Sequence, residues 1–390
     1  VMEVAMNPIR TFQTSPRIVL GAGCLSQIAS EVERLGGTRV MIVTDPGLVA
    51  AGIVDRLEAL LRDGGVAFCR FDQVEPDPRL EIASMATDLI QQEQSDLIIG
   101  IGGGSAIDIA KIASVLATND GDLGQYFGID LIPRPGLKTI IVPTTAGTGS
   151  EVTPIVILSD LEEKLKKGVV SAYLMPNVAL LDAELTLGLP PRVTAATGMD
   201  ALIHAVEAFT SKNAYSMTDM LAREAIRLII DSIRTAFANG SDITARSHML
   251  EGSLLAGMAF ANAGVTAVHA FAYPIGAEYH IPHGVANSIM LTPVMEFNML
   301  GNLKKFAELA DLFGEVTEGK TTREKALAAV EALRILSRDL QIPAHLSDFG
   351  VKDADIPNLA AGVMKVTRLL ANNPRAMTQD DAEAIYRQML

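Results

Sequence analysis

The stretch that decides the fold is DLIIGIGGGSAIDIAK, residues 96–111. Residues 96–101 are typical of a buried strand, a turn of three glycines and a serine follows, and 106–116 have the apolar spacing of a helix. A glycine turn between strand and helix favours phosphate binding, because the backbone can approach the anion and the free amides of the helix attract it. The spacing is neither GxGxxG nor that of a P-loop, so a tight turn that binds nothing is the alternative.

Strand and helix patterns alternate on both sides of this stretch. Strands are predicted over 39–44, 66–71, 138–142 and 178–181, helices over 48–62 and 80–92, and a hairpin over 155–159 and 169–172 around the charged turn 160–167. Such alternation predicts βαβ units and a mostly parallel sheet. Residues 10–20 resemble an additional strand that could pair with a second subunit across a two-fold axis.

The pattern changes after the double proline at 190–191. Strand signals fade there, and helical periods are found over 194–210, 215–238, 244–262, 302–313, 322–340 and 379–389. A chain of 390 residues also exceeds the usual limit for a single hydrophobic core. We therefore predict an α/β N-terminal domain with a mostly parallel sheet over 1–189 and an all-helical C-terminal domain over 190–390.

Composition excludes several classes of protein. The formal net charge of −14 gives no electrostatic basis for binding nucleic acid or an anionic membrane. Two cysteines, Cys24 and Cys69, form neither a disulfide framework nor a cysteine-rich metal site. Residues 2–12 lack the apolar core of a signal peptide, so we expect a cytoplasmic protein.

One segment has the length and composition of a membrane span. Residues 252–277 contain no Asp, Glu, Lys or Arg and are numerous enough to cross a bilayer. They also contain Asn262, His269, Pro274 and several glycines. A helix that is apolar on all sides is equally typical of the core of a large protein, which is the interpretation we favour.

Two further features of the first half can contact a ligand. The turn PTTAGTGS, residues 143–150, follows the strand over 138–142 and brings small hydroxyl residues to the end where open α/β sheets bind ligands. Asp45 directly follows the strand over 39–44. Its carboxylate can accept hydrogen bonds from a ribose diol and repel a 2′-phosphate, or it can cap the helix that begins near Pro46.

The histidines are concentrated in the helical half. Five of the six lie between 204 and 283, and Asp200 and His204 are four residues apart on one face of a predicted helix. Together with His269 and His283 they form a donor set that suits Fe²⁺ or Zn²⁺. Because the surrounding sequence is uncharged, unpartnered polar groups there would be costly. His248 and His345 are expected at the surface or in ordinary packing.

Four motifs of the chain together resemble those of a known family. GIGGGSAIDIAK (100–111), PTTAGTGSEVTP (143–154), GMDALIHAVEAFTS (198–211) and HAFAYPIGAEYHIPHGVAN (269–287) closely resemble the iron-containing, or group III, alcohol dehydrogenases. The resemblance implies a dehydroquinate synthase-like architecture, in which domain 1–189 binds a dinucleotide and domain 190–390 binds a metal and the substrate.

The resemblance also implies roles for individual residues. By matching positions, the metal ligands are Asp200, His204, His269 and His283, and the cofactor-binding residues are Asp45, Asp77, Gly103, Gly104, Ser105, Thr144, Thr145, Thr148 and Lys166. Gly103, Gly104 and Ser105 would bind the pyrophosphate, Lys166 would lie near the nicotinamide ribose, and Asp77 near the adenosine. Asp45 matches a family position where an aspartate accompanies a preference for NAD over NADP.

The implied function is a metal-dependent, NAD-linked alcohol dehydrogenase or aldehyde reductase. The metal would polarise the oxygen of a small alcohol or aldehyde while hydride passes between the carbinol carbon and nicotinamide. Fe²⁺ is the expected metal, and the same donors accept Zn²⁺, Ni²⁺ or Mn²⁺. We expect no nucleic-acid or membrane partner, and a homodimer or higher homo-oligomer.

One departure from the family bears on the proton and on the substrate. Many members carry a second histidine where this chain has Tyr273, so His283 and Tyr273 are the candidate catalytic residues, with His280 as a substitute. A tyrosine there resembles a branch that includes hydroxy-acid dehydrogenases, such as those acting on a 4-hydroxybutyrate-like substrate.

Three other functions remain as alternatives. A dehydroquinate synthase-like lyase would need a basic cluster around the metal, and 194–210 and 262–290 contain no Lys or Arg. A glycerol dehydrogenase-like relative would use Zn²⁺ with fewer histidines. A non-catalytic binding protein with this fold would have no reason to keep the four metal ligands.

Overall fold

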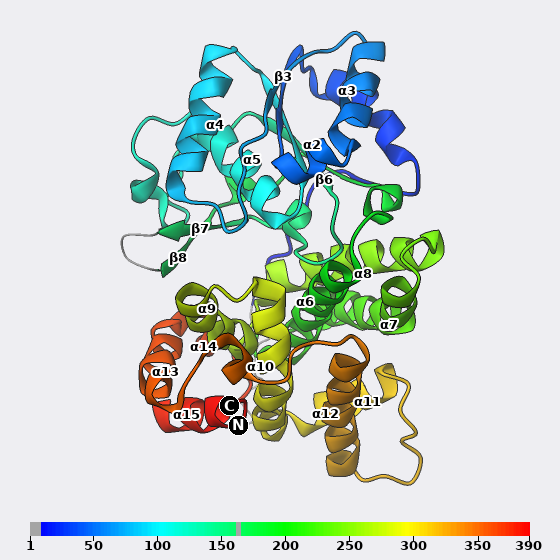
Figure 1. Cartoon of the computed structure of the whole chain (residues 1–390), viewed down its shortest axis with the longest axis vertical. Coiled ribbons are helices and arrows are strands. Elements are labelled where there is room, and N and C mark those ends of the chain that lie inside the picture. The colour runs from blue at the N-terminus through cyan, green and yellow to red at the C-terminus, as the bar shows by residue number, and fades with distance from the viewer. Residues whose placement is uncertain (1–8, 161–164) are drawn as a thin grey trace, which may run out of the picture.

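The computed structural model describes residues 9–160 and 165–390, which form an α/β half and a helical half (Figure 1). The start of segment 2–12 and the centre of turn 160–167, whose predictions are given above, lie outside the described residues. The α/β half is drawn in blue to green at the top of Figure 1, and the helical half in green to red below it.

A six-stranded parallel sheet forms the centre of the α/β half. Its strands, in spatial order, are β1 (Ile18–Leu20), β9 (Val178–Leu181), β6 (Lys138–Pro143), β4 (Leu97–Gly102), β2 (Arg39–Val43) and β3 (Ala67–Phe71). Every neighbouring pair is parallel. All six residues of β4 are buried, as expected of a central strand with helices on both faces. The predicted parallel sheet is therefore confirmed.

Helices cover both faces of this sheet. Those on one face are α1 (Ile28–Leu35) and α3 (Ile53–Asp63), and those on the other are α4 (Leu80–Gln92) and α5 (Gly104–Leu116). Successive side chains of β4 alternate between the two cores, so Ile99 packs with α1 and α3 while Ile98 packs with α4 and α5.

The helix predicted over 48–62 is two helices in the structure. α2 (Pro46–Ala50) ends before Gly52, whose φ of 72° places it in the left-handed region, and α3 begins directly after it. Glycine adopts this conformation without the clash of a Cβ. Apolar periodicity continues across such a break, so the pattern alone does not reveal it.

A second, three-stranded sheet carries the predicted hairpin. β7 (Ile155–Asp160) and β8 (Leu165–Val170) are antiparallel, and β5 (Gly128–Ile129) pairs with the other edge of β8. The hairpin is confirmed, but its second strand begins at Leu165 rather than at 169. The charged residues assigned to the turn include strand residues, because Lys166 and Lys167 belong to β8.

The helical half contains ten α-helices among the described residues. They are α6 (Pro191–Thr210), α7 (Ser216–Ala238), α8 (Ile243–Ala263), α9 (Ala267–Tyr279), α10 (His283–Asn298), α11 (Leu303–Leu312), α12 (Thr322–Asp339), α13 (Ile356–Lys365), α14 (Thr367–Asn372) and α15 (Gln379–Arg387). The sequence patterns do not predict α9, α10, α13 or α14. α9 and α10 contain an internal proline each, Pro274 and Pro293, and are too evenly apolar to show a helical period.

Only part of the extra strand predicted over 10–20 exists. Ile18–Leu20 forms β1, which pairs in parallel with β9 at the edge of the main sheet. Within the described residues, 9–17 form no strand. The backbone of Gln13 instead exchanges hydrogen bonds with the side chain of Asn262 on α8, at 2.7 and 2.9 Å.

The two halves meet closely at a pair of glycines. A Cβ built on Gly257 of α8 would lie 2.8 Å from the Cα of Gly149, in the loop after β6. A Cβ on Gly149 would lie 2.5 Å from the Cα of Gly257, and its φ is 61°. The loop therefore contacts the backbone of α8 directly, which fixes the sheet edge against the helices.

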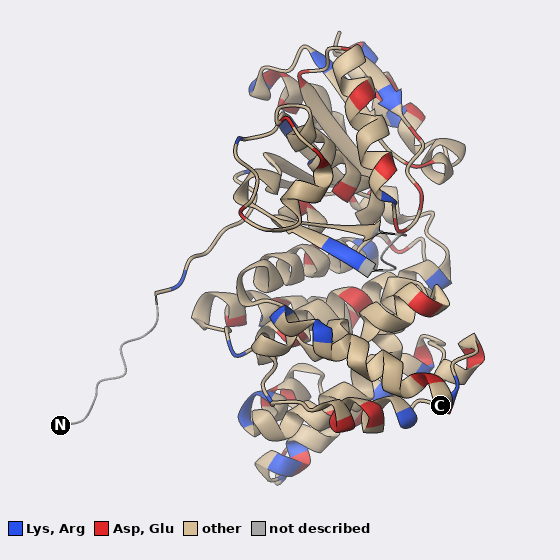
Figure 2. Ribbon diagram, turned by 90° about the vertical axis from the view of Figure 1, so that its left-hand side faces the viewer, with Lys and Arg blue, Asp and Glu red and all other residues tan. Residues whose placement is uncertain are grey.

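No single described helix has the length and hydropathy to cross a membrane; α8 and α9 meet those criteria only as a pair, bent by 102°. Most of the residues of segment 252–277 are buried against the rest of the chain, as the core interpretation predicts. In Figure 2, acidic and basic residues are interspersed along the ribbons of both halves.

Candidate functional site

A cavity of about 350 Å³ lies at the junction of the two halves. One wall comes from the N-terminus of α5, the loop after β6 and the β7–β8 hairpin, and the other from α6, α8, α9, α10 and α14. Of the residues singled out from the sequence, Asp77, Gly104, Ser105, Thr148, Lys166, Asp200, His204, His269, Tyr273 and His283 line it. Asp45, Gly103, Thr144 and Thr145 do not.

The glycine turn forms the N-terminus of α5. Gly103 occupies the N-cap position without a side-chain hydrogen bond, so the first amides of α5 have no side-chain acceptor there. A Cβ on Gly104 would lie 2.9 Å from Cγ2 of Thr148. Glycine is thus required for the two loops to approach each other, and the unbonded amides face an open cavity in which an anion can bind.

The threonine loop lies beside this turn because of the strand register. Gly102, the last residue of β4, is paired with Pro143 of β6, and the amide of Thr144 donates to the carbonyl of Gly102 at 3.0 Å. Thr144 is buried, whereas Thr148 lines the cavity and accepts a hydrogen bond from the amide of Ser150 at 3.2 Å. The two loops therefore form one continuous edge.

Lys166 and Asp77 form an ion pair at the cavity wall. The Nζ of Lys166 on β8 lies 2.6 Å from Oδ1 of Asp77, and the lysine side chain is largely buried. The resemblance assigned these two residues to opposite ends of the dinucleotide. Two paired side chains cannot contact opposite ends at once, so the pairing favours a shared location.

Asp45 caps α2, as its alternative interpretation predicts. Its Oδ1 accepts a hydrogen bond from the amide of Leu48 at 3.1 Å, and Pro46 occupies the first helical position. Its other carboxylate oxygen would be 3.4 Å from a Cβ on Gly102. The carboxylate thus lies beside the strand end that leads into the glycine turn.

The four predicted metal ligands lie on three helices, and three of them form one group of ligand atoms, with His204 beside it. Asp200 and His204 lie on successive turns of α6, His269 lies in the first turn of α9, and His283 is the first residue of α10. Ligand atoms of Asp200, His269 and His283 all lie within 4.8 Å of one another. The Nε2 atoms of His204 and His269 are 3.0 Å apart.

The outer hydrogen bonds of two histidines orient them for a cation. Nδ1 of His204 lies 3.1 Å from the carbonyl oxygen of Gly147, and Nδ1 of His269 lies 2.5 Å from Oε2 of Glu207. Both acceptors require a proton on Nδ1, which leaves a lone pair on each Nε2. These lone pairs would repel each other at 3.0 Å unless a proton or a cation lies between them. The donor set therefore fits a metal ion.

For Asp200, His204 and His283, the pKa shifts favour the protonation state that can bind a metal ion. Burial lowers the pKa of His204 and of His283 to about 4, so both are neutral at physiological pH. Burial opposes the charge of Asp200, but the three nearby histidines outweigh it and lower the pKa of this carboxyl. For His269, burial is outweighed by Glu207 and Asp200, so its pKa is raised. Neutral imidazoles and an ionised carboxylate are the forms that bind divalent cations.

The two candidate proton-transfer residues differ in position. Tyr273 lines the cavity, and its ring centroid is 6.2 Å from that of His283. Burial raises the pKa of Tyr273 although Arg368 opposes the shift, so the phenol stays protonated and is a poor base. His280 is exposed at the end of α9 with a φ of 54°, and it does not line the cavity.

The sequence analysis did not identify several residues that the structure places in the site. Glu207 is fully buried and lies one turn after His204, where helical spacing could have indicated it. Asn287, four residues after His283, donates to Oδ1 of Asp200 at 2.8 Å. Phe260 stacks on His204 with centroids 4.3 Å apart. Arg368 comes from α14, far along the chain, and no local pattern marks it.

The argument against a dehydroquinate synthase-like lyase considered only residues 194–210 and 262–290, which contain no Lys or Arg. Two basic residues from other segments, Lys166 and Arg368, line the cavity. The packing residues agree with their predictions, since Nδ1 of His248 lies 3.1 Å from Oγ of Ser232 on the adjacent helix. His345 occupies the N-cap of a short 3-10 turn.

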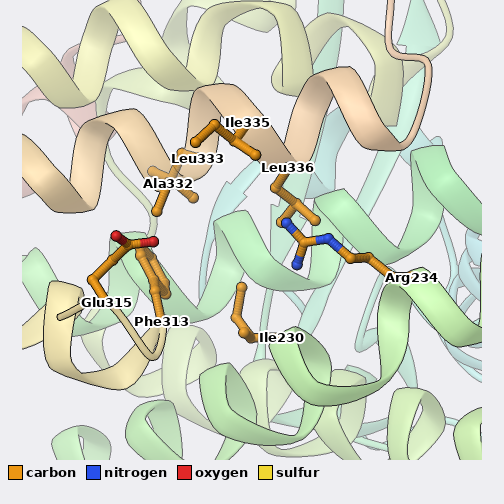
Figure 3. A pocket seen from close by; sticks show the side chains of 8 residues that line it. All are labelled: Ile230, Arg234, Phe313, Glu315, Ala332, Leu333, Ile335 and Leu336. Atoms are coloured by element: carbon orange, nitrogen blue, oxygen red, sulfur yellow. The ribbon is translucent and has the colours of Figure 1, made fainter.

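A second hollow in the helical half is much smaller. It measures about 40 Å³ and lies between α7, α12 and the segment after α11, where Figure 3 shows Arg234 and Glu315 among apolar side chains. Arg234 is already paired with Asp339 at 2.7 Å. This hollow is too small for a dinucleotide, so the junction cavity is the candidate site.

Comparisons with known proteins agree along the whole chain. Residues 15–183 match the model of the iron-containing alcohol dehydrogenases, and 194–390 match the model of the C-terminal part of that family. A sulfoacetaldehyde reductase of Bilophila wadsworthia is 42% identical over 374 residues, covering 95% of this chain and 97% of its own. A 1,3-propanediol dehydrogenase of Klebsiella pneumoniae is 43% identical over 370 residues, covering 94% and 95% respectively.

Solved structures show the same fold. A 1,3-propanediol oxidoreductase superposes with a TM-score of 0.96 at 41% identity, over 98% of this chain and all of that one. The sulfoacetaldehyde reductase of Bifidobacterium kashiwanohense in complex with NAD⁺ gives 0.89 at 29% identity, over 98% and 99%. These relatives are oxidoreductases of alcohol and aldehyde groups, and the chain belongs to the iron-containing alcohol dehydrogenase family.

Proposed function

We propose that this protein interconverts small alcohols and aldehydes with NAD in the junction cavity. In this proposal Asp200, His204, His269 and His283 hold one divalent cation. The observation that carries the proposal is the convergence of one carboxylate and three imidazoles in the same cavity as the N-terminus of α5. When bound, the cation supplies Lewis acidity toward the substrate oxygen, and the nicotinamide supplies or accepts hydride.

The metal proposed first is Fe²⁺. Imidazole and carboxylate donors suit iron, and the same set accepts Zn²⁺, Ni²⁺ or Mn²⁺ according to availability. Glu207 holds the proton on Nδ1 of His269, and the carbonyl of Gly147 does so for His204. Both imidazoles are therefore oriented before the ion arrives, which lowers the entropic cost of binding it.

The dinucleotide is proposed to lie along the edge formed by the two loops. The amides of Gly103, Gly104 and Ser105 receive the pyrophosphate, with Thr144, Thr145 and Thr148 beside them. Asp45, at the end of β2, is proposed to accept from the adenosine ribose and to disfavour NADP. Because Lys166 and Asp77 are paired, we propose that both serve the nicotinamide ribose, rather than Asp77 the adenosine.

The substrate is proposed to lie against the apolar side of the cavity. Phe260, Val265 and Tyr273 contribute to that wall beside the metal ligands. His283 holds the metal, and Tyr273 can donate a hydrogen bond to the substrate oxygen from its protonated phenol. The names of the relatives refer to a sulfonated aldehyde, long-chain alcohols and a diol. Sequence similarity alone therefore does not identify the substrate of this protein.

A homodimer is proposed from the edge of the main sheet. β1 is the edge strand there, and within the described residues only its β9 side is paired. An unpaired edge is a template for pairing with another chain. Light scattering of the purified protein should give twice the mass of one chain. A monomer at all concentrations would exclude the proposed homodimer.

Apo protein reloaded with single metals tests the function. NADH oxidation with a panel of aldehydes is measured for the wild type, for Asp200→Ala and for Asp231→Ala, an exposed aspartate of α7 paired only with Arg227. We expect activity with Fe²⁺ or another first-row ion, a loss of about 1000-fold or more in Asp200→Ala, and no change in Asp231→Ala. Turnover that survives in Asp200→Ala, or activity with none of the metals, would refute the proposal.

A further inference from the structure

Arg368 is the one lining residue of the junction cavity whose charge has no partner in the described residues. The other lining cation outside the histidine cluster, Lys166, is paired with Asp77 at 2.6 Å. Asp108 accepts from Ser150 Oγ at 2.5 Å and from the amide of Ile157 at 2.9 Å. Arg368 makes neither an ion pair nor a hydrogen bond within the described chain.

The backbone that carries Arg368 is firmly positioned. It belongs to α14, which packs against α9, the helix of His269 and Tyr273. The side chain of Asn372, one turn further on, donates to the carbonyl of Val265 at 3.0 Å, and its carbonyl accepts from the amide of Lys212 at 2.9 Å. The helix that carries Arg368 is therefore fixed beside the cavity, and the exposed Arg368 side chain contributes to the cavity wall.

The charge of Arg368 acts on the reacting end of the cavity. Arg368 lines the same cavity as His269 and Tyr273, and its helix packs on the helix that carries both. The glycine turn belongs to the opposite wall, in the α/β half. A dinucleotide pyrophosphate bound at that turn would be held by amides of α5, which leaves the guanidinium on the other wall available to the substrate.

An anionic substrate would need such a cation. The cavity is also lined by Asp77, Asp108 and Asp200, and the chain as a whole carries a net charge of −14. Asp77 is balanced by Lys166, and Asp200 would be balanced by the proposed cation. Arg368 is therefore the positive charge in the described lining that remains for a carboxylate or sulfonate. The planar guanidinium offers two parallel N–H donors that match two oxygens of either anion.

We propose that Arg368 determines specificity, by selecting short aldehydes and alcohols that carry a terminal carboxylate or sulfonate. The inference rests on the proposed function and names the substrate class of the same site. The guanidinium holds the anionic group, while the carbon to be reduced or oxidised faces the histidine cluster. Reduction consumes one NADH and one proton per aldehyde, yields the alcohol and NAD⁺, and leaves the anionic group unchanged.

Matched substrates test this selection. The carboxylate arm compares 4-oxobutanoate with its neutral methyl ester, and the sulfonate arm compares 3-oxopropane-1-sulfonate with butanal. We expect the wild type to have the higher kcat/KM for the anionic member of at least one pair, and the better arm identifies the anion. A higher kcat/KM for the neutral member of both pairs would overturn the proposal.

Variants of Arg368 show whether this residue is responsible. In Arg368→Gln the ratio of kcat/KM between anionic and neutral members should fall by about 10- to 100-fold, mainly through KM, as expected for a lost hydrogen bond between charged groups. Arg368→Lys should recover part of the ratio. Arg234→Gln, which removes an arginine of the surface pair with Asp339, is the control and should keep it. An unchanged ratio in Arg368→Gln would overturn the proposal.

A binding measurement separates this inference from the proposed function. With NADH bound, butyrate and ethanesulfonate should quench nicotinamide fluorescence at lower concentration than butyramide does, and Arg368→Gln should abolish the difference. If Arg368→Gln weakens NADH itself as much as the anions, the residue serves the cofactor and the inference fails. If the wild type reduces only neutral aldehydes, the inference fails and the function stands. If no aldehyde is reduced with any metal, the function fails.

Discussion

At the scale of single residues, the candidate metal site depends on groups that do not touch the ion. Glu207 accepts hydrogen bonds from Nδ1 of His269 at 2.5 Å, from Thr266 Oγ1 at 2.6 Å and from the amide of Val268 at 2.7 Å. Its carboxylate thus fixes both the tautomer of His269 and the start of α9. A buried charge placed in this way has a function beyond packing, since burying it alone would be costly.

Glu207→Gln should therefore weaken metal binding without removing a ligand. The amide keeps the volume but loses the charge that holds the Nδ1 proton, and such outer partners commonly change metal affinity by about 10- to 100-fold. Titration against a chelator of known affinity measures the change. Glu308→Gln, in the half-exposed pair with Arg223, is the matched control. Equal affinity in both variants would show that Glu207 only supports the fold.

Asp45 has two separable roles in this account. Asn caps helices as well as Asp does, so Asp45→Asn removes the charge and keeps the cap on α2, whereas Asp45→Ala removes both. We expect both variants to raise kcat/KM for NADPH relative to NADH by about tenfold or more. Only Asp45→Ala should also lower stability, by about 1 kcal/mol. A cofactor ratio that Asp45→Asn leaves unchanged would contradict the role in NAD preference.

At the scale of elements, the site depends on the loop after β6 touching α8. Gly257→Ala places a Cβ 2.8 Å from both Cα of Gly149 and Cγ2 of Val152, so the loop must move. We expect a loss of about 1–3 kcal/mol in stability and weaker NADH binding, because Thr148 of the same loop lines the cavity beside the glycine turn. Thermal unfolding and NADH fluorescence check this.

Gly188→Ala is the control for that variant, because nothing lies within 4 Å of a Cβ at this position. It should bind NADH and unfold as the wild type does. If Gly257→Ala behaves like Gly188→Ala, then the close approach of loop and helix does not position the cofactor edge.

The elements that the sequence predicts are those with a clear period. β4 is an unbroken apolar run, and α4 has the bounds that its spacing predicts, because each buries a regular face. α9 and α10 are missed because they are buried on most sides and each contains a proline. The same burial makes them suitable for holding His269 and His283 away from water.

The site was predictable where family motifs are local and missed where contacts are long-range. Asp200, His204, His269 and His283 could be named from the chain. The structure groups the ligand atoms of Asp200, His269 and His283 and places Nε2 of His204 3.0 Å from that of His269. Arg368 is distant in sequence and has no motif, so only the packing of α14 on α9 reveals it. The pairing of Lys166 with Asp77 likewise requires the fold.

At the scale of the whole molecule, stability is linked to pH through a buried cluster under the cavity. Lys111 is fully buried and donates to the carbonyls of Ile155 at 2.7 Å and Ser150 at 3.0 Å, and Asp108 lies 3.9 Å from it. Burial raises the pKa of the nearby Glu151 to about 7, and Oε1 of that residue has no hydrogen-bond partner among the described residues.

Glu151→Gln should therefore stabilise the fold only at higher pH. The folded state holds the Glu151 proton more tightly than the unfolded chain, whose pKa is near 4.5. The cost of burying this carboxylate is thus absent below about pH 4.5, grows as pH rises, and is complete above about 7. We expect Tm of the variant to exceed that of the wild type by a few degrees at pH 8 and to match it near pH 5.

Lys111 makes the opposite contribution at alkaline pH. Burial lowers its pKa from 10.5 to about 8, so the cost of burying its charge is present below 8 and is relieved between 8 and 10.5. The comparison at pH 5 and 8 therefore reports mainly on Glu151. A Tm difference of the same size and sign at both pH values would contradict the assignment.

The central claim is that one divalent cation binds where α6, α9 and α10 converge. A crystal of the Fe²⁺-loaded protein, measured at the iron absorption edge, tests it most directly. We predict one anomalous peak per chain, within bonding distance of Asp200, His204, His269 and His283. A peak elsewhere, or one that touches none of these histidines, would contradict it.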